Sequence, residues 1–165
     1  MRTFQDSMFA HKYRMTLTDL LEDLREDPEA IALFEEFHPS LWGDLAEQGY
    51  QCLALEQLPR AVQIFGFLKE ISPDEPAYHA AYADACAGMK QYMDAAEGYF
   101  TTAQLAPQVP DAHFYFAEIM LFFQHPEVAL ASLQTAAEHM VEATQHPLFS
   151  KLVEYQNYAT SQTNH

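Results

Sequence analysis

Histidine and cysteine are the residues of this chain best suited to hold a metal ion or to act as nucleophiles. The sequence has eight histidines and two cysteines. It contains no H-E-x-x-H motif, and its two cysteines, Cys52 and Cys86, do not form a C-x-x-C pair. Cys52 and Cys86 have the same spacing as His79 and His113. A shared spacing favours equivalent packing positions over metal ligands or nucleophiles, so we expect no metal site and no cofactor.

Carboxylates are abundant but are not gathered into a catalytic pattern. The chain has 24 Asp and Glu against 8 Lys and Arg, a formal net charge of −16 at pH 7. No Ser-His-Asp arrangement, P-loop or G-x-G-x-x-G motif accompanies them, and we expect no enzyme. Such a surface repels phosphate groups, which argues against nucleic acids and anionic membranes. It suits a basic or apolar partner, or is simply a well-solvated exterior.

Length and composition indicate one soluble, helical domain. The 165 residues are 49% hydrophobic and include only five glycines, and no alternating strand pattern is evident. The chain has no 18-residue apolar run, and its first fifteen residues lack the apolar core of a signal peptide. We therefore expect no membrane insertion and a cytoplasmic location, which also fits the two unpaired cysteines.

A regular repeat runs through the middle of the sequence. The columns that recur are Gly49, Ala83 and Ala117; Cys52, Cys86 and Met120; Ala61, Ala95 and Ala129; Phe65, Tyr99 and Leu133; and Pro73 with Pro107. Their common step is the period of about 34 residues that is typical of the tetratricopeptide repeat, a pair of antiparallel helices. Small residues let the two helices approach closely, a large residue fills the neighbouring gap, and proline ends each unit.

The repeat predicts an all-α solenoid of three helix pairs, because one helix pair cannot bury its apolar face alone. We place the repeats at about 42–75, 76–109 and 110–143. An N-terminal helical extension, 1–41, precedes them, and a C-terminal capping helix with a frayed tail, 144–165, follows. Within the extension, Asp27 is expected to cap a helix that begins at Pro28.

A leucine stripe in the extension follows the helical spacing i, i+3, i+4, i+7. It consists of Leu17, Leu20, Leu21 and Leu24. The stripe could form a dimer face or could fold back on the first repeat. The sequence leaves both alternatives open.

The first helices of stacked repeats usually line a concave groove, with positions two, five, nine and twelve facing it. The candidate groove residues are Tyr50, Leu53, Ala80, Asp84, Ala87, Phe114, Glu118 and Leu121. They form a mostly apolar trough with small residues and two acids, which fits an extended peptide with apolar anchors. The acids would repel the C-terminal carboxylate that some tetratricopeptide co-chaperones clamp. The alternative is that the trough packs against the chain's own terminal helices.

Three stretches resemble the class II chaperones of bacterial type III secretion, which serve the hydrophobic translocators. They are "MTLTDLLEDL", "AVQIFGFL" and "AYHAAYADACAGMKQYMDAAEGYFTTAQLAP", and the resemblance covers roughly 16–140. The chain departs from the family where Glu56 replaces a usual glycine and Pro59 is added. Only Tyr50 remains of a first helix that is often tyrosine-rich in the family.

The resemblance implies a cytoplasmic chaperone that keeps hydrophobic secreted translocators soluble before export. It implies that the candidate groove residues grip an extended client segment, and that the N-terminal helices form a homodimer. The alternative is a tetratricopeptide scaffold or regulatory adaptor for soluble partners. A chaperone for needle subunits is a related alternative.

Overall fold

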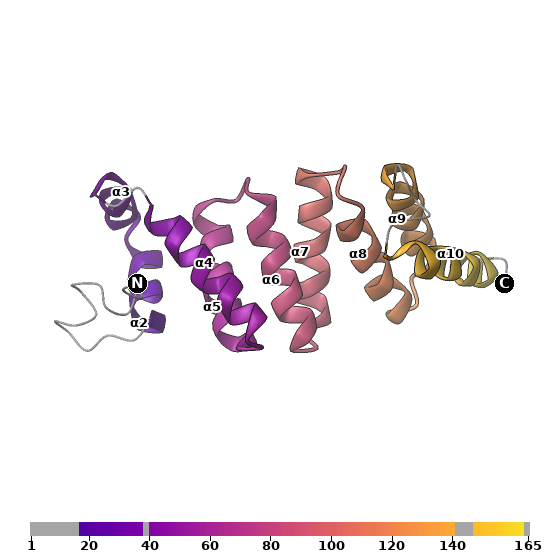
Figure 1. The fold of residues 1–165 in the computed structure, drawn as a ribbon, viewed down its shortest axis with the longest axis horizontal. Helices are drawn as coiled ribbons and strands as arrows, with labels where there is room; N and C mark the ends of the chain where they lie inside the picture. The colour runs from indigo at the N-terminus through magenta and orange to yellow at the C-terminus, as the bar shows by residue number, and fades with distance from the viewer. Residues whose placement is uncertain (1–16, 38–39, 141–146, 164–165) are drawn as a thin grey trace. The chain divides into compact units, whose positions relative to one another are not determined.

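The described part of the protein is built from α-helices. The computed structural model describes residues 17–37, 40–140 and 147–163, and within these ranges it contains nine helices and no strand (Figure 1). The all-α prediction is therefore confirmed. The segments 1–16 and 141–146 lie outside the described residues; the first belongs to the predicted extension, and the second spans the end of the predicted third repeat and the start of the predicted C-terminal region.

The chain divides into two compact units between Pro73 and Asp74, two residues before the predicted end of the first repeat. The first unit holds α2 (Leu17–Glu26), α3 (Pro28–Phe37), α4 (Leu41–Ala54) and α5 (Leu58–Ile71). The second holds α6 (Pro76–Gly88), α7 (Tyr92–Leu105), α8 (Pro110–Phe122), α9 (Pro126–His139) and α10 (Phe149–Thr163). Helices α4/α5, α6/α7 and α8/α9 pack as three successive pairs.

The same turn joins the two helices of every pair. Glu56, Lys90 and Gln124 have φ values of 55°, 62° and 62°, which is the left-handed region. In each turn two backbone N–H groups return to the end of the first helix, as when Glu56 donates to Leu53 and Gln57 donates to Cys52. This is the Schellman end of a helix, in which glycine is the usual left-handed residue. The turn occurs at the same position of each repeat, so the backbone has the same period as the sequence.

The first unit packs large side chains around one glycine. Ile64, Phe65, Phe67 and Leu68 on α5 are fully buried. A Cβ at Gly49 of α4 would lie 2.7 Å from the Phe65 ring, so the missing side chain at this position lets α4 approach α5 closely. At the start of α3, Asp27 Oδ1 accepts hydrogen bonds from the N–H groups of two residues in the first turn, which confirms the predicted cap.

The second unit packs α6 against α7 through alanines. Ala81, Ala83 and Ala85 on α6 and Ala95 on α7 are buried. A Cβ at Gly98 of α7 would lie 2.9 Å from the carbonyl oxygen of His79 and 2.9 Å from Ala83 Cβ. The small residues therefore bring the two helix backbones together at this crossing.

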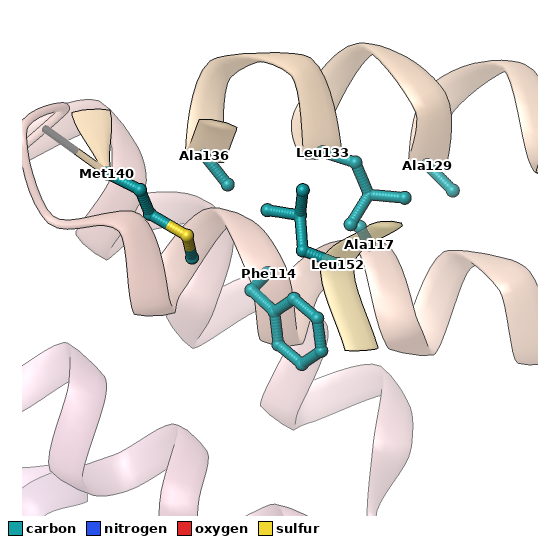
Figure 2. Close-up of a cluster of buried hydrophobic side chains, with 7 residues drawn as sticks. All are labelled: Phe114, Ala117, Ala129, Leu133, Ala136, Met140 and Leu152. Carbon is teal, nitrogen blue, oxygen red and sulfur yellow. The ribbon is translucent and has the colours of Figure 1, made fainter. Parts of the chain in front are cut away.

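The C-terminal part of the second unit is closed by α10. Figure 2 shows seven buried side chains from α8, α9 and α10 and the residue after α9 pointing toward one another. They are Phe114, Ala117, Ala129, Leu133, Ala136, Met140 and Leu152. Leu152 of α10 thus completes the core that α8 and α9 cannot close by themselves, as expected of a capping helix.

Candidate partner-binding cleft

The second unit contains an open cleft of about 400 Å³ with aromatic walls. It is called the tyrosine cleft here and is lined by Ala87, Tyr92, Tyr99, Tyr115, Glu118, Ile119 and Phe122. These residues come from α6, α7 and α8. Ala87 leaves room because its side chain is a single methyl group, and the aromatic rings supply apolar area with polar tips.

Two ring contacts fix the cleft walls. The rings of Tyr99 and Tyr115 stack with centroids 5.4 Å apart, and those of Tyr92 and Phe122 are 5.0 Å apart. Tyr99 is only 5% exposed, whereas Phe122 is 66% exposed. The cleft therefore has a fixed inner wall at Tyr99 and an exposed apolar wall at Phe122 that a partner could cover.

The hydroxyl of Tyr99 is held by a carboxylate. It donates a hydrogen bond of 2.7 Å to Asp84 Oδ1 on α6. Burial raises the pKa of Tyr99 above the usual phenol range, and the charge of Asp84 and the hydrogen bond to it raise this pKa further. The phenol therefore keeps its proton. Burial raises the pKa of Asp84, while the bond from Tyr99 acts in the opposite direction. The pair fixes the inner wall and places a carboxylate beside it.

A second phenol and carboxylate meet next to the cleft. Tyr155 of α10 donates a hydrogen bond of 2.7 Å to Glu118 Oε1, and Glu118 lines the cleft. Burial, and next the bond to Glu118, raise the pKa of Tyr155 to about 12. The C-terminal helix therefore orients the one carboxylate in the lining of the cleft.

The predicted groove residues of the second unit are only partly brought together. Ala87 and Glu118 both line the tyrosine cleft, and Asp84 touches it through its bond to Tyr99. Ala80 and Leu121 are half-buried and are not among the residues that line this cleft.

Phe114 lies elsewhere than expected for an exposed groove wall. It is 1% exposed, and its ring stacks on Tyr155 of α10 with centroids 5.5 Å apart. The reason is that α10 covers this part of α8 and uses Phe114 as core. A partner would reach Phe114 only if α10 moved, so at this position the chain's own terminal helix occupies the trough.

The first unit holds the other two groove candidates. Tyr50 is 44% exposed, and its ring lies 4.9 Å from that of the buried Phe65. Leu53 is half-buried. Tyr50 thus presents one accessible aromatic face on α4.

Part of the leucine stripe is already covered within the first unit. Leu21 and Leu24 are 2% and 3% exposed. The helix that carries them, α2, packs on α3 and α5, and Arg25 bonds to Glu70 of α5 at 2.6 Å. The side chains of Leu17 and Leu20 lie outside the described residues. Leu21 and Leu24 therefore serve the fold of one chain, which was the alternative to a dimer face.

Sequence reasoning missed five of the seven cleft residues. They are Tyr92, Tyr99, Tyr115, Ile119 and Phe122. The predicted groove positions all belong to the first helix of a repeat, whereas Tyr92 and Tyr99 belong to a second helix, α7. The signal that could have found the cleft is the density of aromatic residues in the second and third repeats around a single alanine, Ala87.

The described residues offer neither a metal site nor a membrane span. They contain no group of three or more His, Cys, Asp or Glu side chains that could hold a metal ion, and Cys52 and Cys86 are buried free thiols. In the same part of the chain, every helix is too short or too polar to cross a membrane.

No family model and no curated protein matches the sequence. Several solved structures are similar to this chain. The type III secretion translocator chaperone SycD of Yersinia enterocolitica matches with a TM-score of 0.69 at 17% identity, covering 82% of this chain and 94% of SycD. PcrH, in complex with the chaperone-binding region of PopD, matches with a TM-score of 0.64 at 18% identity, over 73% and 92% of the chains.

A third similar structure comes from a different setting. The TPR2B domain of yeast Sti1, in a complex with pHsp70, matches with a TM-score of 0.64 at 16% identity, over 73% of this chain and 97% of the domain. At these identities the similarity establishes the fold: the chain is a tetratricopeptide-repeat solenoid, as the period of its sequence predicts.

Proposed function

We propose that this protein is a cytoplasmic type III secretion chaperone. It binds hydrophobic translocator proteins and keeps them soluble before export. The grip is on a short extended segment of the client, and the tyrosine cleft of the second unit receives at least one side chain of that segment. No chemical step is needed.

The tyrosine cleft is the observation that carries the proposal. It is open, has a volume of about 400 Å³ and offers the exposed ring of Phe122 beside half-buried Tyr92 and Tyr115. Binding sites of this size usually combine apolar walls with a few polar groups that fix orientation. A partly open cleft suits a side chain from an extended chain that runs across it.

The comparisons support the choice of client. SycD is a translocator chaperone, and PcrH was solved with the chaperone-binding region of PopD. Together with the stretches that resemble this family, they favour a translocator segment as the occupant of the cleft. Alanine at position 87 and the aromatic walls would accept an apolar or amphipathic anchor.

Holding the client is a matter of mass action. A membrane-active translocator aggregates in water, and any complex that covers its apolar segments lowers the free concentration of the aggregating form. The strongly acidic exterior, with a net charge of −16, would keep the complex soluble through repulsion between like-charged particles.

A homodimer through the N-terminal helices is part of the proposal. Because Leu21 and Leu24 are buried within one chain, the dimer would use other residues of the extension, or would exchange α2 between two chains. Light scattering after size-exclusion chromatography would distinguish a particle of roughly twice the mass of the 18.8 kDa chain from the monomer.

Affinity capture from the native cells tests the function. The tagged wild-type chain is compared with Ala87→Trp, which fills the cleft, and with Val128→Trp, which adds the same ring at an exposed position of α9 outside the cleft. We expect one or two hydrophobic secreted proteins to dominate with the wild type and with Val128→Trp and to be lost with Ala87→Trp. Recovery of soluble cytoplasmic proteins that survive Ala87→Trp would contradict the proposal.

A scaffold or adaptor for soluble partners is the second candidate. The similarity to the Sti1 domain in its pHsp70 complex favours it. Glu118 in the cleft and Asp84 beside it disfavour binding of an anionic peptide terminus, because both carry charge of the same sign as a carboxylate.

A further inference from the structure

The tyrosine cleft combines aromatic rings with negative charge, and this combination has a chemical meaning beyond apolar binding. Glu118 is the carboxylate of the lining, and Asp84 accepts the hydrogen bond of the Tyr99 hydroxyl. The pKa of Tyr115 is raised mainly by burial and further by the charges of Asp111, Asp84 and Glu118. The inner part of the cleft therefore has a negative potential.

The hydrogen bonds that these carboxylates accept do not cancel that potential. Tyr155 and Tyr99 donate to Glu118 and Asp84 as neutral phenols. A neutral hydroxyl supplies a dipole and no net charge. Tyr155 approaches Oε1 of Glu118, and a carboxylate has about four acceptor positions, so capacity remains for a donor in the cleft.

The chain has little positive charge of its own to bring to this place. Between residues 74 and 165 the sequence has eleven Asp and Glu but no arginine and only two lysines, Lys90 and Lys151. Both lysines are exposed, and neither lines the cleft. Neither lysine of this stretch therefore places a cation in the cleft, and a cationic side chain of a partner would find opposite charge there.

We propose that the tyrosine cleft is a specificity pocket for an arginine side chain of the bound client segment. The guanidinium would lie against the rings of Tyr115 or Phe122 and donate hydrogen bonds to Glu118. This inference rests on the proposed function, since it names the side chain that the client segment places in that site.

Arginine fits these walls better than lysine does. Its planar guanidinium stacks on aromatic faces and presents a fork of donors to a carboxylate. It is also more weakly hydrated than an ammonium group, so entry into a partly enclosed cleft costs less. The attraction of a cation to a ring face adds to the charge pairing.

A small probe isolates this recognition from the client. The probe is Nα-acetyl-arginine N-methylamide, and its neutral isostere is the citrulline derivative. Each is titrated into the full-length chain while the ring resonances of the cleft tyrosines are followed by NMR. The variants are Glu118→Gln and, as a control with the same loss of charge, Glu127→Gln at an exposed position of α9.

We expect saturable shifts with the arginine probe and affinity lower by roughly tenfold for citrulline and for Glu118→Gln, because both remove the ion pair. Glu127→Gln should match the wild type. Glutamine at 118 still accepts from Tyr155, so the fold is retained. Equal binding of the two probes, equal binding by Glu118→Gln, or no saturable shift would overturn the arginine pocket.

Failure of this inference is separable from failure of the proposed function. If Glu118→Gln captures the hydrophobic secreted client as well as the wild type does, the arginine pocket is wrong and the chaperone role stands. If the arginine probe binds in a Glu118-dependent way but the captured proteins are soluble, the pocket stands and belongs to an adaptor for basic peptides.

Discussion

The first and second units use the same pair of repeat positions in opposite ways. Tyr50 and Phe65 of the first unit make an aromatic contact with centroids 4.9 Å apart. Asp84 and Tyr99, which occupy the same two positions one repeat later, make a hydrogen bond of 2.7 Å instead. One helix pair therefore fills this place with apolar ring area, and the next fills it with a carboxylate and a phenol.

The difference shows how a repeat acquires a site without losing its fold. In the third helix pair, Glu118 occupies the equivalent position and finds its partner in Tyr155 of α10. Acids at this position in both the second and third repeats place charge at the tyrosine cleft. The first unit has an aromatic residue there and carries no such charge.

The glycine at the crossing point of the helices lies on a different helix in each unit. In the first unit Gly49 faces the larger Ile64, whose methyl group would lie 3.0 Å from an added Cβ. In the second unit the equivalent residues are Ala83 and Gly98, and glycine is now on the second helix. A glycine on either helix of a pair therefore lets the two backbones approach closely.

The largest effect is expected for Gly98→Ala. The new Cβ would meet the backbone carbonyl of His79, which cannot move without shifting α6. We expect a loss of about 2–3 kcal/mol by urea denaturation, which is typical of overpacking. Gly49→Ala meets the side chains of Phe65 and Ile64, which can adjust, and should cost about 1 kcal/mol less. A stabilised Gly98→Ala would contradict the close crossing.

The hydrogen bond of the second unit gives the next effect. Tyr99→Phe removes the hydrogen bond to the charged Asp84 side chain, so we expect a loss of about 1–2 kcal/mol. The double variant Asp84→Tyr, Tyr99→Phe installs the aromatic pair of the first unit and should regain part of this loss. Thermal and urea unfolding of the three proteins measure it, and an unaltered Tyr99→Phe would refute the bond.

The turns of the helix pairs should respond alike in both units. Glycine tolerates the left-handed conformation better than any residue with a Cβ, and it can be introduced at each turn by Glu56→Gly, Lys90→Gly and Gln124→Gly. We expect each to stabilise its unit by about 1 kcal/mol. Glycine at exposed Glu97, in the middle of α7, is the control and should destabilise by a similar amount. A uniform loss at the three turns would argue against the Schellman geometry.

The smallest effect concerns pH. Because the folded state raises the pKa of Asp84, the folded state binds this proton more readily than the unfolded chain does. The contribution of Asp84 to the free energy of unfolding therefore falls as the pH rises from the pKa of the unfolded chain to the higher pKa of the folded state. Asp84→Asn avoids the charge, so its stability relative to the wild type should decline as pH is lowered from 7 toward 4. An unchanged difference would show that Asp84 is not desolvated.

Repeating features were predictable from the sequence, and the cleft was largely not. The repeating columns predicted the helix pairs because packing at crossings demands small residues at fixed positions, as at Ala83. Ala87 and Glu118 were found by position alone. Tyr92 and Tyr99 were missed because they reach the cleft from the second helix of a pair, and Phe114 was misplaced because α10, a non-repeating element, covers it.

Binding of the client segment to variants at equivalent positions of the two units tests the central claim most directly. Ala87→Trp fills the tyrosine cleft, and Leu53→Trp adds the same ring one repeat earlier, in the first unit. The dissociation constant of a fluorescent client segment should rise by at least about tenfold for Ala87→Trp and much less for Leu53→Trp, since steric blocking removes a buried anchor. Client binding unaffected by Ala87→Trp would contradict a cleft that grips the client.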